Sequence, residues 1–204
     1  MVNPGDAVVW PLPVPTSEPG VSPGQISSDG TVWAMPIQTP DGPPFRVRVS
    51  WLRHGTWQTR QLDRSTSAVP GGVAVSGDHV AALSSFDGAT VLPVGVLAVT
   101  SDGGDTWTDL RKEDLPFDAV DSMAATSGGT LYIGGYGSAR YSGVYRSTDA
   151  TWTHFEKVPG TRGVSGVVPA GRVVLGLRGT SDRRPPRLLA VFDDHGNRTD
   201  VPIR

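Results

Sequence analysis

The chain has 204 residues, a formal net charge of -2 and no cysteine. The low charge provides no general attraction for a phosphate backbone, so nucleic acid is not expected as a partner, and the lack of cysteine excludes disulfides and thiolate metal sites. Glycine and proline, at 26 and 18 residues, exceed a fifth of the chain. Because apolar residues are nevertheless spread throughout, the composition predicts a turn-rich folded protein and not a disordered one.

Residues 1–23 are predicted to form a proline-rich leader, in which residues 6–14 make one outer strand. The first ten residues lack the basic and apolar regions of a signal peptide, so no secretion signal is predicted and the compartment stays open. The longest apolar run, 91–99, contains Pro93 and Gly95. It is far shorter than the ~20 residues of a membrane helix, so no membrane association is predicted.

From residue 24 onward, short apolar runs end in Gly, Pro, Asp or Ser, which predicts many antiparallel strands and almost no helix. Tryptophans 57, 107 and 152 lie 50 and 45 residues apart, and Thr199 follows 47 residues later. A Gly or Asp turn before an apolar strand keeps the same phase, near residues 29, 77, 128 and 170. A period of this length is typical of propeller blades.

These two markers predict an all-β fold, a β-propeller of about four four-stranded antiparallel blades. The blades are expected at 24–64, 71–112, 117–158 and 162–204. Three arrangements remain open: a compact ring, a half ring completed by a homodimer, and the tail of a larger parent propeller. An open array leaves strand edges exposed, which favours association.

The stretch "TSDGGDTW" at 100–107 is the best-preserved part of the repeat. The Thr100 hydroxyl and the Asp102 carboxylate can bond backbone groups of a turn, and Gly103 or Gly104 can take a positive φ. Trp107 is then expected to start the next strand and to bury its ring. The aspartate is therefore predicted to fold a hairpin and not to act in catalysis.

The pattern S/T-x-D-x-G-x-T-W resembles the Asp-box, or BNR repeat, of sialidase-like propellers. One copy matches fully, and later copies keep only part of the pattern: Thr100, Asp102, Gly104, Thr106 and Trp107; then Ser147, Asp149 and Trp152; then Asp194 and Gly196. The resemblance implies a propeller fold and slightly favours a secreted or extracellular protein. It implies no single function, because such repeats occur in hydrolases, lectins, receptors and assembly factors.

Two predicted loops carry candidate ligand-binding residues. Tyr136, Arg140 and Tyr141 lie in or near the glycine-rich loop of the third unit, and Arg183 and Arg184 lie in the proline-stiffened loop of the fourth. Tyrosine and arginine suit a carbohydrate or a protein, because they combine a flat apolar face with hydrogen-bond donors. The alternative interpretation is that these are core tyrosines and solvated arginines.

No nucleophile elbow, dinucleotide fingerprint or calcium loop is present, and the histidines stand singly, so we predict no catalytic residue, no cofactor and no metal. The sialidase resemblance implies an arginine triad and a tyrosine assisted by a glutamate. Candidates are Arg46, Arg140, Arg184 and Tyr141, with Glu18, Glu113 and Glu156 poorly placed. We predict a non-catalytic binding module and keep a glycoside hydrolase, or a fragment of one, as the alternative.

Overall fold

The computed structural model describes residues 24–27, 29–39, 42–62, 68–86, 93–136, 141–178 and 188–202. These residues form sixteen strands and one short 3-10 helix, η2 (Lys112–Asp114). The predicted leader strand and the loop arginines 140, 183 and 184 lie outside the described residues. In the described part of the chain, no helix is long and apolar enough to cross a membrane.

The strands make four separate antiparallel sheets of four strands each, so the prediction of an all-β, four-bladed architecture is confirmed. The first sheet holds β1 (Gln25–Ile26), β2 (Val32–Thr39), β3 (Gly42–Arg53) and β4 (Thr56–Gln61). The second holds β5 (Ala68–Ser76), β6 (His79–Phe86), β7 (Val94–Thr100) and β8 (Thr108–Arg111). The third holds β9 (Ala119–Ala125), β10 (Leu131–Tyr136), β11 (Gly143–Ser147) and β12 (Phe155–Lys157). The fourth holds β13 (Val164–Ala170), β14 (Val173–Arg178), β15 (Leu188–Asp193) and β16 (Arg198–Pro202).

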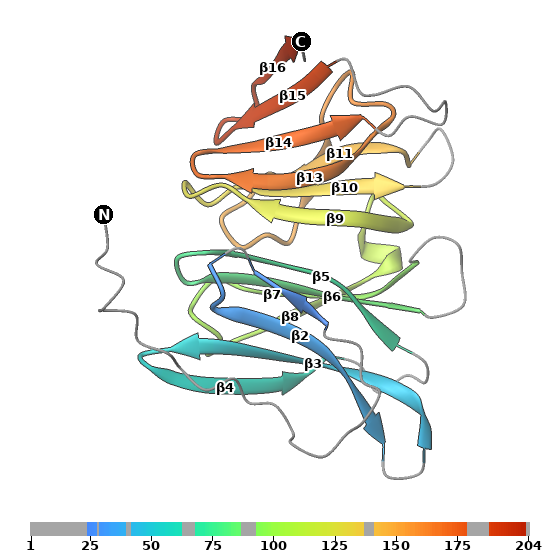
Figure 1. Cartoon of the computed structure of the whole chain (residues 1–204), viewed down its shortest axis with the longest axis vertical. Helices are drawn as coiled ribbons and strands as arrows, with labels where there is room; N and C mark the ends of the chain where they lie inside the picture. Colours follow the sequence, from blue (N-terminus) through green and yellow to red (C-terminus); the bar gives the residue numbers. More distant parts are fainter. Residues whose placement is uncertain are drawn as a thin grey trace.

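Each sheet packs face to face on the next along the chain. Figure 1 shows the four sheets following one another along the long axis of the molecule, from the first at one end to the fourth at the other. Three apolar clusters fill the spaces between the first and second, second and third, and third and fourth sheets. No cluster of described residues joins the first sheet to the fourth, so this part of the chain forms an open series of blades and not a compact ring.

The second and third sheets are buried on both faces, because alternate side chains of their strands point into two different apolar clusters. In β10, Leu131 and Ile133 point into the cluster shared with the second sheet, while Tyr132 between them points into the cluster shared with the fourth. This explains why the strands read as continuous apolar runs and not as an alternation of apolar and polar residues. Burying a leucine or isoleucine of this kind contributes roughly 1.5–3 kcal/mol, so these interfaces hold the blades together.

Candidate functional site

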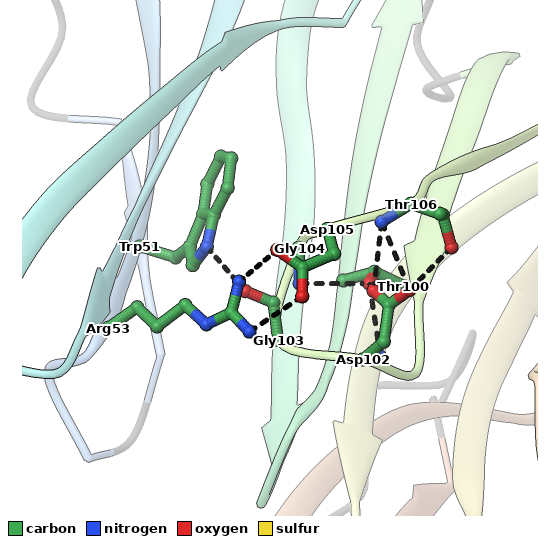
Figure 2. A network of polar contacts seen from close by, with 8 residues as sticks. All are labelled: Trp51, Arg53, Thr100, Asp102, Gly103, Gly104, Asp105 and Thr106. Carbon is green, nitrogen blue, oxygen red and sulfur yellow. Dashed lines mark hydrogen bonds and ion pairs between the residues drawn. The ribbon is translucent and has the colours of Figure 1, made fainter.

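A single carboxylate organises the turn between β7 and β8, residues 100–107 (Figure 2). Asp102 Oδ2 accepts a hydrogen bond from Thr106 Oγ1 at 2.6 Å, and Asp102 Oδ1 accepts one from the Thr106 N–H at 3.0 Å. Thr100 Oγ1 donates to Asp102 Oδ1 at 2.7 Å and accepts from the Gly104 N–H at 3.0 Å. These bonds, that of the Thr106 hydroxyl above all, lower the pKa of Asp102. The carboxylate therefore stays ionised and serves the backbone of its own turn.

Two glycines let this turn close against the first sheet. Gly103 and Gly104 have φ values of 70° and 93°, a region that side chains rarely adopt. Trp51 Nε1 donates to the Gly103 carbonyl at 3.0 Å, and a Cβ on Gly104 would lie 2.5 Å from the Trp51 ring. Trp107 packs edge-on against the same ring, with the centroids 5.1 Å apart. The turn thus joins the second sheet to the first.

Asp149 plays the corresponding part in the turn between β11 and β12. Its Oδ1 accepts from the Thr153 N–H at 3.0 Å, and its Oδ2 accepts from Thr153 Oγ1 at 2.6 Å and Thr151 Oγ1 at 2.7 Å. Burial raises the pKa of Asp149, but hydrogen bonds from Thr151, Thr153 and His154 together outweigh burial and lower it. Like that of Asp102, the Asp149 carboxylate is therefore engaged by hydrogen bonds within its own turn.

Two other residues of the third repeat depart from the pattern of the second. Trp107 directly precedes β8, whereas Trp152 lies inside its turn, three residues before β12 begins at Phe155. Trp152 is fully buried with a φ of 59°, and its Nε1 donates to the Gly129 carbonyl at 2.7 Å. The Ser147 hydroxyl accepts from the Leu131 N–H at 3.0 Å, so it bonds its own sheet and not the turn. The two-residue deletion in this repeat explains the change of path.

The fourth turn requires a correction to the predicted residues. The repeat pattern assigns the turn carboxylate to Asp194, but Asp193 supplies it: Oδ1 accepts from the Asn197 N–H at 2.9 Å and Oδ2 from Asn197 Nδ2 at 2.9 Å. The Asn197 amide is the main cause that lowers the pKa of Asp193. Asp194 Oδ1 is buried with no hydrogen-bond partner among the described residues. Gly196 takes the positive φ of this turn, 81°.

Each acidic turn also receives side chains from the preceding sheet. Besides Trp51, the first sheet provides Arg53, whose guanidinium holds both carboxylate oxygens of Asp105 in the second sheet's turn. The second sheet provides His79, whose Nε2 contacts the Ala150 carbonyl of the third turn at 2.7 Å. These turns act as links between neighbouring blades, which is a structural role.

The link from the third to the fourth sheet involves three successive carbonyls of one turn. Tyr132 Oη, Thr130 Oγ1 and Arg146 Nη1 donate to the carbonyls of Asp193, Asp194 and His195, at 2.6, 2.8 and 2.8 Å. The Asp193 carbonyl also accepts from the Gly196 N–H of its own hairpin at 3.1 Å, whereas the carbonyls of Asp194 and His195 have no such partner among the described residues. The neighbouring sheet therefore satisfies them and fixes the turn at the same time.

Of the five candidate ligand-binding residues, the structure describes two, and it places them differently. Tyr136, the last residue of β10, is 50% exposed and does not line the hollow that holds Tyr141. Tyr141 lines a surface hollow beyond the end of β10, and its carbonyl accepts a hydrogen bond from the Tyr145 hydroxyl at 3.1 Å. Tyr136 and Tyr141 are therefore not brought into one site.

The hollow beside Tyr141, called here the Tyr141 hollow, has a volume of about 580 Å³. It lies between the third sheet and the connection, including η2, that leads into that sheet from the second. It combines apolar, cationic and anionic side chains: Lys112, Glu113, Leu115, Pro116, Asp118, Tyr141, Tyr145 and Lys157. Lys112 Nζ lies 3.2 Å from Asp118 Oδ1, and Lys157 Nζ lies 5.7 Å from the centroid of the Tyr145 ring. Sequence reasoning missed both lysines, because they come from different repeats and no motif connects them.

A second hollow, of about 300 Å³, follows the inner strands of all four sheets. These strands, β1, β5, β9 and β13, each stand at the edge of their sheet. Among the described residues that line this second hollow, which we call the groove, Asp121 is the one carboxylate. A two-carboxylate hydrolase needs a pair about 5–10 Å apart, and the described lining does not contain such a pair. Arg46, the described member of the predicted arginine triad, lies in β3 and does not line the groove.

The search for relatives gives a likeness in structure alone. No protein-family model matches the chain, and no curated protein matches its sequence. A structure from an analysis of two prolyl endopeptidases has a TM-score of 0.50 at 20% identity, with 85% of this chain and 25% of that chain covered. A nidogen/laminin complex has a TM-score of 0.47 at 13% identity, covering 78% and 58%. YCF48 bound to a D1 peptide has a TM-score of 0.44 at 14% identity, covering 83% and 50%.

This chain thus spans less than two thirds of the length of each of these proteins. Two of the three structures are complexes with a protein or peptide. At identities of 20% or below, the likeness extends to the fold and not to the residues of a site. Together with its four antiparallel four-stranded sheets, stacked face to face, the chain has a β-propeller fold.

Proposed function

We propose that this chain is a non-catalytic propeller module that binds a carbohydrate or a protein at the Tyr141 hollow. The observation that carries the proposal is the position of Tyr141, a residue chosen from sequence for ligand binding, in the wall of a hollow of about 580 Å³. Ligand sites are typically concave, with apolar walls and a few polar groups, and this hollow has both. The rest of the proposal follows from the chemistry of its walls.

The walls suit a ligand with an apolar face and hydrogen-bonding edges. Leu115, Pro116 and the tyrosine rings offer surfaces on which a sugar ring or an apolar side chain can lie. Lys112 and Lys157 donate hydrogen bonds, while Glu113 and Asp118 accept them. Because both charge signs are present, a neutral or mixed-charge ligand is favoured over a polyanion.

We further infer that the acidic turns correspond to Asp-boxes with a purely structural role. Support comes from the turn at 100–107, where the Asp102 carboxylate bonds Thr100 and Thr106 of its own hairpin. Asp149 and Asp193 are engaged in the same way by their own turns. Because both oxygens of each carboxylate are already engaged by bonds of its own turn, we assign binding to the Tyr141 hollow.

The test is binding of the protein to arrays of glycans and of peptides, compared between the native chain and a Tyr141→Ala variant. Truncation of a central aromatic contact typically costs more than about 1 kcal/mol, so we expect binding to weaken by roughly tenfold. Phe86→Ala is the matched control, because Phe86 is 40% exposed and does not line the hollow. It should bind as the native chain does.

Mass spectrometry of the glycans after contact separates binding from catalysis. Intact glycans on the array support the binding module, whereas shortened glycans would show a hydrolase and overturn the proposal. Equal binding by the native chain and Tyr141→Ala would also overturn it, since the ligand would then lie elsewhere on the molecule.

A further inference from the structure

The fourth sheet has one face packed in the core and another at the end of the molecule (Figure 1). Its core face contributes Val174, Ala190 and Phe192 to the cluster shared with the third sheet. Side chains alternate along a strand, so the residues between these point the other way. They form what we call the end face: Val168, Val173, Leu175, Leu177, Leu189, Val191 and Val201.

Strand register makes the end face continuous across all four strands. One row runs from Val168 through Leu175 and Val191 to Thr199, and a second runs from Leu177 through Leu189 to Val201. Paired residues on one face of a sheet have their Cβ atoms about 5 Å apart, so each row is a contiguous apolar strip. Val168, Leu177 and Val201 are 43%, 42% and 43% exposed.

The end face carries no free charge in the described part of the chain. All seven of its members are valine or leucine, and Thr199 is the polar residue beside them. Asp193 lies at its margin, opposite Val173, and the hydrogen bonds of its own turn engage both carboxylate oxygens. A contiguous apolar surface of this kind marks an interaction site.

The three interfaces inside the molecule indicate what covers such a face. In each of them, an apolar face of one sheet packs on an apolar face of the next. The end face has the composition of those buried faces but no described sheet upon it. Its natural partner is therefore another apolar sheet face, packed about 10 Å away.

The outer face of the first sheet does not match the end face. On that face, Arg48 lies between Met35 and Gln61 in one row of paired residues. The apolar residues there are already buried, since Trp33 and Met35 are only 8% and 3% exposed. A second copy adding head to tail would have to place Arg48 against the valines and leucines of the end face. Burial of an unpaired guanidinium in this way is costly.

We propose that the end face is the interface of a homodimer, in which the fourth sheets of two copies pack on each other about a two-fold axis. A self-complementary patch is what such symmetry requires, and an uncharged one brings no like charges together. This inference does not depend on the Tyr141 hollow, which no described residue of the fourth sheet lines. The proposal extends the function by making the module bivalent, with one hollow on each copy.

An engineered cysteine tests the geometry directly, because the chain has no cysteine of its own. Thr199→Cys places a thiol on the end face, in the row of Val191. Under mild oxidation we expect a disulfide-linked species of two chains. Thr108→Cys is the matched control, since Thr108 is an exposed residue of β8 in the second sheet and should give no linked species.

Light scattering measures the mass without any cross-link. We expect the native chain to have twice the mass of one chain, Leu177→Asp to have the mass of one chain, and Phe86→Asp to remain a dimer. Circular dichroism of each variant confirms that the sheets are retained. A native mass of one chain, a mass that Leu177→Asp leaves unchanged, or a ladder of higher oligomers from head-to-tail addition would each overturn the proposal.

Discussion

At the scale of single residues, the acidic turns show how one carboxylate can hold a hairpin turn closed by hydrogen bonds. The two oxygens of Asp102 accept from Thr100 and Thr106, a set of bonds that lies within seven residues of chain. Charge-assisted hydrogen bonds are about twice as strong as neutral ones, so a short acidic residue is well suited to close a tight turn. The glycines beside it then decide how near the turn can approach the next sheet.

Gly104 is the residue whose replacement should be most damaging in this turn. An alanine there combines a φ of 93° with a Cβ 2.5 Å from the Trp51 ring. Gly77→Ala is the matched control, because Gly77 has a φ of 57° and nothing within 4 Å of its Cβ position. We expect Gly77→Ala to lower the free energy of unfolding by about 1 kcal/mol. Gly104→Ala should lower it by about 1–3 kcal/mol more, since the steric clash adds to the backbone cost.

Urea unfolding followed by tryptophan fluorescence measures both variants. Equal losses in Gly104→Ala and Gly77→Ala would show that the approach to Trp51 contributes nothing to stability.

At the scale of elements, the turns work as links because each is satisfied partly by the sheet before it. The Tyr132 hydroxyl illustrates this, since it leaves β10 and donates to the Asp193 carbonyl in the turn before β16. Its ring lies between the sheets, with its centroid 5.3 Å from that of Phe192. A single side chain therefore contributes both to the apolar cluster and to the position of the neighbouring turn.

Tyr132→Phe keeps the ring and removes the hydrogen bond. We expect a loss of about 1 kcal/mol in the free energy of unfolding near neutral pH, because the Asp193 carbonyl loses the Tyr132 hydroxyl and keeps only the Gly196 N–H as a donor. Tyr136→Phe is the control, since Tyr136 is exposed and should tolerate the change. Urea unfolding of both variants checks the expectation, and an equal effect on the two would contradict it.

The same residue predicts a dependence on alkaline pH. Burial is the main cause that raises the pKa of Tyr132 to about 12. Because the folded-state pKa is above the unfolded value of about 10, the associated stability is complete below pH 10 and is lost as the pH rises toward 12. Absorbance titration should show a phenol that ionises near pH 12 in the native chain and is missing in Tyr132→Phe.

At the scale of the whole molecule, four carboxylates in three turns make stability depend on acid. The pKa values of Asp102, Asp105, Asp149 and Asp193 are all lowered by hydrogen bonds that the ionised form accepts. A folded-state pKa below the unfolded value means that the stability is present above about pH 4 and is lost as the pH falls further. Protonation would loosen the links between blades along the full length of the stack.

We therefore expect the free energy of unfolding to be level near neutral pH and to fall steeply below about pH 4. Asp102→Asn should be less stable than the native chain at neutral pH and should lose less on acidification. Asp121→Asn is the control, because the Asp121 carboxylate has no hydrogen-bond or ion-pair partner among the described residues. Urea unfolding across this pH range tests both; identical slopes for Asp102→Asn and Asp121→Asn would refute the explanation.

The sequence predicted the class of fold well because the repeat is a local property. Turn residues and apolar runs recur with the length of four strands, and the four sheets follow that period. The sequence pattern was less precise where a shift of one residue matters: it assigned the turn carboxylate to Asp194, and Asp193 supplies it. Adjacent aspartates have the same chemistry, and only the exact path of the hairpin selects the one that closes the turn.

The candidate site was less predictable than the fold. Tyr141 was proposed from its loop, whereas Lys112 of η2 and Lys157 of β12 line the same hollow and were not singled out from the sequence. Spacing along the chain says nothing about which side chains share a hollow. Tyr136, five residues from Tyr141, does not line that hollow. A contact across an interface depends on how the sheets stack, and the repeat does not encode that.

By itself, the sequence determined the strands, their turns and the number of sheets, because these depend on alternation, glycine and aspartate over a few residues. Only the tertiary structure decided that the described sheets form an open stack, which residues line its hollows and which sheet face is left at its end. The physical reason lies in the apolar runs themselves. A run such as that of β14 shows that both faces of a sheet favour burial, but it does not show what covers each face.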